Sequence, residues 1–179
     1  MVRNLYYIHG MDSSPQGFRA QYLARHYPGI VIPALPNDVD RRREILLETL
    51  RAPAYVVGNS LGGLSSLDFV RHYPKPVKAM VLLAPAVGFH EPRYQTAEIQ
   101  DFVAQLYIPS GMPTTVVAAL RDEVVRLEAI DALVQRSPDP ANIRFIRVDD
   151  DHLMHLESSL RVMREAIDHM LRAPVPDPV

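Results

Sequence analysis

Short apolar runs alternate with longer amphipathic segments along most of the chain. Six runs are apolar or β-branched on both faces, as expected of parallel strands buried on both sides; they cover residues 4–8, 30–32, 55–57, 77–83, 114–120 and 143–148. Segments with helical spacing lie between them, at residues 17–27, 39–51, 61–73, 123–136 and 155–172. The alternation predicts an α/β fold with a mainly parallel sheet of about six strands and helices on both faces.

Two stretches break this alternation. Residues 86–112 lie between two predicted strands and contain a helical patch at residues 97–106, and long excursions of this kind are often lids or binding loops. A surface helix without a role in binding is the alternative. The Pro-rich residues 174–179 are expected to form an extended tail, so that residues 1–173 form a single domain, with 86–112 as a possible lid insertion.

The composition narrows the classes of partner. The chain has 179 residues, 47% of them hydrophobic, and a net charge of -2, which gives no excess of cations for binding nucleic acid. It has no cysteine, which excludes disulfides, thiolate metal sites and a cysteine nucleophile and fits a reducing compartment. The first apolar run is too short for a signal peptide or a membrane span. We therefore expect a cytoplasmic protein with neither nucleic-acid nor membrane partners.

One basic cluster, Arg41 to Arg43, stands at the start of an amphipathic segment. Consecutive charges on a helix usually form a solvated face. We expect this cluster to be exposed and assign it no function.

The strongest chemical signal is Gly58-Asn-Ser-Leu-Gly62, which follows a predicted strand and precedes a predicted helix. This G-x-S-x-G pattern in this context is typical of the nucleophile elbow of α/β-hydrolases, and it makes Ser60 the candidate nucleophile. Side chains at positions 58 and 62 would collide with the sharp turn or the neighbouring strand, so glycine is required there. The alternative is an ordinary loop that matches a short pattern by chance.

A second feature is the loop that begins at His9-Gly10, directly after the first predicted strand. It resembles the loop that completes the oxyanion hole in this class. The backbone N–H groups of Met11 and Leu61 are the expected oxyanion donors, and His9 is expected to be structural.

The candidate acid is Asp122, directly after the strand at 114–120. It would hold the imidazole of a catalytic histidine in the correct tautomer. A helix cap is the alternative role for Asp122, and Glu123 is the reserve acid.

The candidate base is His152, which follows Asp149-Asp-Asp151 after the last strand. The order Ser60, Asp122, His152 is the nucleophile–acid–base order of α/β-hydrolases. His155 is a rival, although it falls inside a predicted helix. His152 and His155 are not accompanied by an HExxH pattern, so no metal site is expected.

These motifs together resemble the YqiA-like small bacterial esterases, which are compact α/β-hydrolases of about this length. The resemblance covers nearly the whole chain and rests on Tyr6-Tyr-Ile-His-Gly10, Gly58-Asn-Ser-Leu-Gly-Gly63, Arg121-Asp122 and Asp151-His152. It implies a triad of Ser60, Asp122 and His152 and esterase activity on short acyl chains. The chain departs from the family's usual residues at Met11 and Asn59.

The sequence thus predicts a serine hydrolase that cleaves a small-molecule ester or thioester through an acyl-enzyme and needs no cofactor. Aromatic side chains of the 86–112 segment are expected to wall the acyl site: Phe89, Tyr94, Phe102 and Tyr107. A non-catalytic binding protein on the same fold, and an acyltransferase or peptidase with the same triad, are the alternatives.

Overall fold

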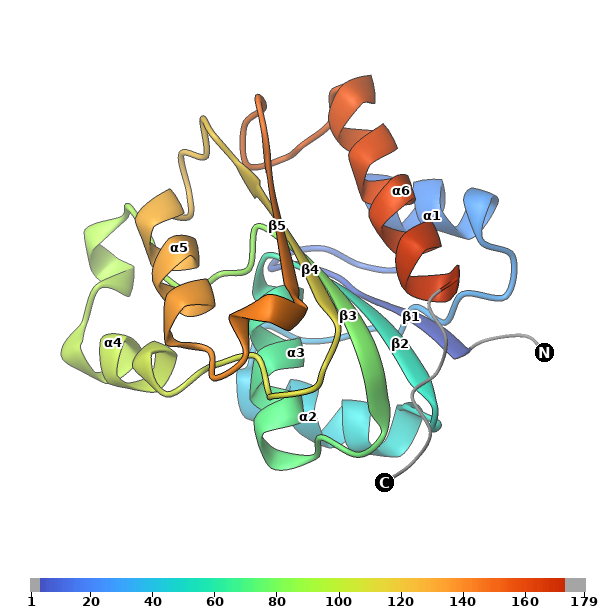
Figure 1. The fold of residues 1–179 in the computed structure, drawn as a ribbon, viewed down its shortest axis with the longest axis horizontal. Helices are drawn as coiled ribbons and strands as arrows, with labels where there is room; N and C mark the ends of the chain where they lie inside the picture. The colour runs from blue at the N-terminus through green and yellow to red at the C-terminus, as the bar shows by residue number, and fades with distance from the viewer. Residues whose placement is uncertain (1–3, 173–179) are drawn as a thin grey trace.

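The computed structural model describes residues 4–172, and its centre is one parallel sheet (Figure 1). Five strands lie side by side in chain order: β1 (Asn4–Ile8), β2 (Ala54–Asn59), β3 (Val77–Leu83), β4 (Thr114–Ala119) and β5 (Ile143–Val148). Because all five run in the same direction, their carboxyl ends meet at one edge of the sheet, where loops can bring distant residues together.

Helices cover both faces of this sheet (Figure 1). One face is covered by α1 (Phe18–His26) and α6 (Glu157–Arg172). The other is covered by α2 (Val39–Thr49), α3 (Leu61–His72), α4 (Ala97–Ala104) and α5 (Leu127–Arg136). Two short 3-10 helices, η1 (Pro92–Tyr94) and η2 (Pro140–Asn142), lie in the connections.

The strands are apolar on both faces because each face has its own core. In β1, Tyr6 and Ile8 pack into the core beneath α2 and α3, whereas Leu5 and Tyr7 pack into the core beneath α1 and α6. Each fully buried large side chain contributes roughly 1.5 to 3 kcal/mol to folding. The prediction of a parallel sheet enclosed by helices is therefore confirmed.

The prediction of a sixth strand at residues 30–32 is wrong. Only Val31 pairs with β1: its N–H donates to the carbonyl of Leu5 at 2.9 Å, and its carbonyl accepts the Tyr7 N–H at 3.0 Å. Pro33 follows almost at once and has no N–H with which to extend the pairing. The run is a single bridge at the edge of the sheet.

Two helices begin later than the spacing predicts. Helix α5 begins at Leu127 instead of residue 123, since the preceding residues pair with the 86–112 segment through a bridge between Val125 and Phe89. Helix α6 begins at Glu157, so His155 lies outside it.

The 86–112 segment contains η1 and α4, and its second half is part of the core. Val103, Leu106, Ile108 and Met112 are all buried there. The predicted tail at 174–179 lies outside the described residues. No helix within residues 4–172 has the length and apolar character needed to cross a membrane.

Candidate active site

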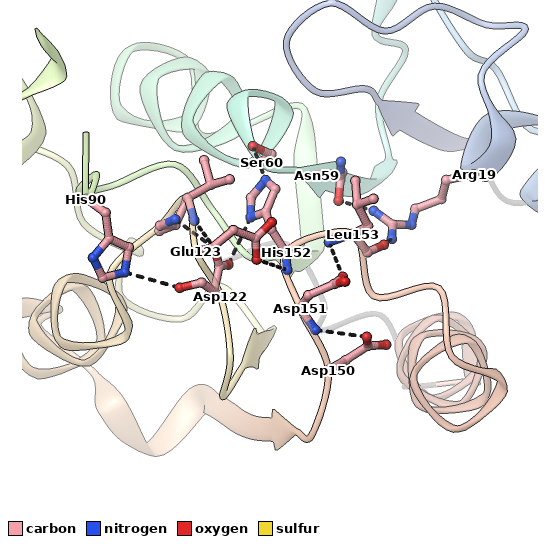
Figure 2. A network of polar contacts seen from close by, with 12 residues as sticks. Arg19, Asn59, Ser60, His90, Asp122, Glu123, Asp150, Asp151, His152 and Leu153 are labelled. Carbon is pink, nitrogen blue, oxygen red and sulfur yellow. Dashed lines mark hydrogen bonds and ion pairs between the residues drawn. The ribbon is translucent and has the colours of Figure 1, made fainter.

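Ser60 stands on the turn between β2 and α3, at the carboxyl edge of the sheet (Figure 2). Its backbone has φ 51° and ψ -116°, which is an unfavourable conformation for a residue with a side chain. The turn is held by the Ser60 N–H, which donates to the carbonyl of Leu83 at 2.8 Å. The strand–turn–helix context predicted for Ser60 is present.

The two glycines of the motif are required by close backbone approach. A Cβ at position 62 would lie 1.8 Å from the carbonyl oxygen of Ile8 in β1. A Cβ at position 58 would lie 2.8 Å from the carbonyl oxygen of Gly62. Glycine at position 62 thus lets the turn pack against β1, and glycine at position 58 lets the first turn of α3 pack against β2.

His152 reaches Ser60 from the loop between β5 and α6. The Nε2 atom of His152 lies 3.1 Å from the Oγ atom of Ser60 (Figure 2). These residues are 92 positions apart in the chain. The side chain of His152 is 12% exposed, so the imidazole remains accessible from the cavity beside it.

Asp122 contacts the opposite side of the same imidazole. Its Oδ2 atom lies 2.9 Å from His152 Nδ1, while its Oδ1 atom accepts the N–H groups of Val124 and Val125 at 2.9 and 2.7 Å. The predicted contact with the histidine is present, whereas the alternative role as a helix cap is not: Val124 and Val125 precede α5, whose N-cap residue is Arg126. With Nδ1–H donating to the carboxylate, Nε2 is free to accept the Ser60 hydroxyl proton.

The two rival residues lie nearby but make different contacts. Glu123 accepts the backbone N–H of His152 at 3.2 Å and so supports the loop. His155 packs its ring on Phe18, with 4.4 Å between the centroids, and burial together with the charge of Arg19 lowers the pKa of His155. Of these two histidines, it is His152 whose ring accepts the Ser60 hydroxyl.

The aspartates before His152 shape the loop instead of contacting the imidazole. Asp149 pairs with Arg121 at 2.8 Å, and Asp151 accepts the N–H of Leu153. The buried Asp150 accepts two backbone N–H groups, from Asp151 at 2.8 Å and from Leu156 at 3.0 Å. Burial acts to raise the pKa of Asp150, but the nearby Ser159 hydroxyl, these two N–H groups and the charge of Arg121 together hold it below its ordinary value.

The two predicted oxyanion donors border one cavity with Ser60. Leu61 is the first residue of α3, so its N–H has no acceptor within the helix. The carbonyl of Ser60, in the same peptide group, accepts N–H groups from Gly63, Leu64 and Ala86 at 2.9 to 3.1 Å. Met11, in the loop after β1, lines the same cavity.

The loop before Met11 contains a buried histidine. His9 is 1% exposed, and its Nε2 accepts the N–H of Leu35 at 3.2 Å. Its Nδ1–H donates to the carbonyl of Gly10 at 2.9 Å. Burial lowers the pKa of His9 and so favours the neutral ring. These contacts are structural in kind, as predicted.

Arg42 corrects the prediction of a solvated basic cluster. Its side chain is fully buried, and it donates to the carbonyls of Pro36, His9 and Gly10. Burial lowers its pKa to about 10. The signal was present in the spacing, because Arg42 lies one helical turn before the buried Leu46.

The cavity beside Ser60 has a volume of about 400 Å³. Phe89 and Tyr94 form part of its wall, with 5.0 Å between their ring centroids. The other two aromatics predicted for this wall do not line the cavity: Phe102 packs against the core, and Tyr107 is exposed. Two of the four predicted wall residues are therefore in place.

Arg19 is a site residue that the sequence analysis missed. It lines the cavity from α1, and it donates both to the side chain of Asn59, beside Ser60, and to the carbonyl of Leu153, beside His152 (Figure 2). One guanidinium therefore connects the Ser60 turn to the His152 loop. Nothing in the sequence marks this role, because α1 and the loop are more than 130 residues apart.

Within the part of the chain that the structure describes, no group of three or more His, Cys, Asp or Glu side chains is placed to hold a metal ion. The site offers three groups that are joined by hydrogen bonds: the Ser60 hydroxyl, the His152 imidazole and the Asp122 carboxylate.

Most of the chain matches a known protein family. Residues 37–175 match the family model Hydrolase_4, described as "Serine aminopeptidase, S33". A search of curated proteins finds no match.

Solved structures share the fold over nearly the whole chain. Alpha/beta hydrolase domain-containing protein 10 from mouse is 18% identical, with a TM-score of 0.73 and coverage of 94% of this chain and 89% of that one. A monoacylglycerol lipase from Paleococcus ferrophilus is 12% identical, with a TM-score of 0.75 and 93% coverage of each chain. A carboxylesterase from Bacillus subtilis is 13% identical, with a TM-score of 0.70 and coverage of 97% and 85%.

Proposed function

We propose a function from the premise that this chain belongs to the Hydrolase_4 family, described as serine aminopeptidase, S33, and has the α/β-hydrolase fold. The protein is a serine hydrolase that cleaves a carboxylic ester or thioester through an acyl-enzyme on Ser60. The observation that carries the proposal is the continuous chain of hydrogen bonds from Asp122 through His152 to Ser60.

The reaction proceeds in two steps, acylation and then deacylation of the Ser60 Oγ atom. His152 Nε2 takes the Ser60 proton as Oγ attacks the acyl carbon, and the same proton then passes to the departing alcohol or thiol. Water then attacks the acyl-enzyme and gives a proton to His152. His152 passes this proton to the Ser60 Oγ atom as the carboxylic acid leaves. Asp122 holds the imidazole and stabilises its cationic form.

The negative oxygen formed in each step is stabilised by the N–H groups of Met11 and Leu61. Leu61 N–H lies at the positive end of the α3 dipole, which favours charge at this position. Removing one such donor typically costs roughly 100- to 1000-fold in rate.

The acyl group occupies the 400 Å³ cavity beside Ser60. A short acyl chain is what the resemblance to YqiA-like esterases implies. Phe89 and Tyr94 of the 86–112 segment close one wall and limit its length. The names of two structural neighbours, a lipase and a carboxylesterase, support an ester substrate, as does the resemblance to YqiA-like esterases.

The family description favours one second candidate, an aminopeptidase. Glu91 and Glu123 line the cavity and could bind a free amino group of a peptide substrate. Hydrolysis rates on p-nitrophenyl esters and on amino-acid p-nitroanilides separate the two. Faster turnover of the anilides would show that the protein is a peptidase that uses the same triad, instead of an esterase.

The proposal is tested by labelling with a fluorophosphonate probe, followed by hydrolysis of p-nitrophenyl esters of graded chain length. We expect Ser60→Ala to abolish labelling, and His152→Ala and Asp122→Asn to reduce kcat about 1000-fold or more. Glu123→Gln and His155→Ala are the matched controls, with losses below about tenfold. Labelling that survives Ser60→Ala overturns the proposal, and a rate that keeps rising with long chains contradicts the short-chain assignment.

A further inference from the structure

Arg42 is a buried cation placed directly behind the loop that contributes Met11. Within residues 4–172 no carboxylate lies at ion-pair distance from it. Its Nη1 donates to the carbonyl of His9 at 2.8 Å, and its Nη2 donates to the carbonyl of Gly10 at 3.2 Å. A buried charge without a counter-ion is costly to folding, so its position here calls for a physical reason.

The reason lies in the geometry of the peptide between Gly10 and Met11. A trans peptide is planar, and its C=O and N–H point in opposite directions. When Arg42 fixes the Gly10 carbonyl, it also fixes the Met11 N–H, which points away from the guanidinium. Met11 lines the cavity together with Ser60, whereas Arg42 does not.

The same carbonyl has a second donor. His9 Nδ1–H lies 2.9 Å from the Gly10 oxygen, and His9 is itself held by the Leu35 N–H at its Nε2 atom. A carbonyl that accepts two hydrogen bonds, one from a cation, polarises its peptide group and makes the N–H a stronger donor. Arg42 and His9 thus orient the Met11 N–H and make it a stronger hydrogen-bond donor.

We propose that Arg42 is a positioning residue for the oxyanion hole: through the Gly10 carbonyl it directs and polarises the Met11 N–H. This rests on the proposed function, because it requires an oxyanion at Ser60. Arg42 does not touch substrate, so its effect is confined to steps in which negative charge develops on the acyl oxygen.

The test uses Arg42→Met and Arg42→Lys, with kcat expressed per site titrated by a fluorophosphonate. Arg136→Met is the matched control, since Arg136 also donates to two carbonyls and burial also lowers its pKa. Its two carbonyls belong to Leu106 and Val103, neither of which lines the cavity beside Ser60, whereas Gly10 does. Titration corrects for any loss of folded protein.

For Arg42→Met we expect kcat per titrated site to fall about 10- to 100-fold, with KM within about threefold. The inhibition constant of phenylboronic acid, which forms a tetrahedral adduct on serine, should rise in parallel. For Arg42→Lys, kcat per titrated site should lie between that of Arg42→Met and that of the unsubstituted protein, because lysine keeps the charge but loses the two-point contact. Arg136→Met should leave kcat per site unchanged.

A purely structural role gives a different result. Lower thermal stability with kcat per titrated site within twofold of the unsubstituted protein would overturn the proposal for Arg42. If Arg42→Met does not fold, an unchanged kcat per site in Arg42→Lys has the same consequence. Absence of Ser60 labelling in the unsubstituted protein would instead overturn the proposed function itself.

Discussion

The Ser60 turn and the His152 loop meet at one hydrogen bond, yet they are held in place by different kinds of contact. The Ser60 turn is held by backbone: its N–H and C=O make four hydrogen bonds to other main-chain groups. The His152 loop, residues 149–156, is held largely by side chains, including the carboxylates of Glu123 and Asp150 and the guanidinium of Arg19.

This difference determines how each region responds to substitution. Backbone contacts persist when side chains change, so the Ser60 turn should fail only when its close packing is violated. Each side-chain contact of the His152 loop can be removed singly, so that region should weaken by steps.

The largest effect is expected from Gly62→Ala. Its Cβ would lie 1.8 Å from the carbonyl oxygen of Ile8. The backbone of position 62 fixes the Cβ and the carbonyl is part of β1, so neither can move without separating β1 from the turn. We expect a loss of about 3 kcal/mol or more in the free energy of unfolding and no detectable ester hydrolysis. Urea unfolding and activity assays measure both.

Gly17→Ala is the matched control. Gly17 has φ -62°, and the atom nearest to an added Cβ is the movable Oγ of Ser13 at 2.8 Å. The free energy of unfolding should change by less than about 1 kcal/mol. Normal stability and activity in Gly62→Ala would show that the turn is not held by its packing.

An intermediate effect is expected from Asp150→Asn. Because the pKa of Asp150 is lowered in the folded protein, its stabilising contribution is present above the unfolded pKa of about 3.9 and is lost as pH falls through the folded value. At pH 7 we expect the substitution to cost about 1 to 2 kcal/mol of unfolding free energy. The difference from the unsubstituted protein should shrink below about pH 4.

Asp149→Asn is the control for this prediction, since Asp149 forms an exposed pair with Arg121. Its substitution should cost less than about 1 kcal/mol. Equal losses for the two aspartates, measured by urea unfolding at pH 7 and pH 3, would contradict the assignment of Asp150 as the internal support of the loop.

The same contrast explains what the sequence could reveal. Ser60 and its glycines are set by a local strand–turn–helix pattern, and the pattern predicted their positions. Asp122 and His152 were predicted from their places after strands, because parallel topology brings those ends together. Val31 was assigned to a strand because its apolar character is local, whereas the limit on its pairing comes from the neighbouring Pro33.

What the sequence concealed are contacts between distant segments. The spacing places Arg42 on the same helix face as the buried Leu46, but it does not show that the partners of Arg42 there are the carbonyls of the His9 loop. Phe102 and Tyr107 were expected beside Phe89 because they share a segment, but the folded segment turns them elsewhere. The directions in which α4 and the loop after it face follow from tertiary packing, which composition does not encode.

The smallest effect is expected where the two regions are joined, at Arg19. Lysine keeps the charge but lacks the forked guanidinium that contacts Asn59 and Leu153 at once, so the His152 loop should lose one hydrogen bond. The hydrogen bonds of Asp150 and Asp151 should still hold the loop in place. For Arg19→Lys we expect a loss of about 1 kcal/mol in transition-state stabilisation, roughly fivefold in kcat. Arg25→Lys, at an exposed position of the same helix, should leave kcat unchanged. If Arg19→Lys also leaves kcat unchanged, the loop is positioned by its own carboxylates, and the two regions meet only through Ser60 and His152.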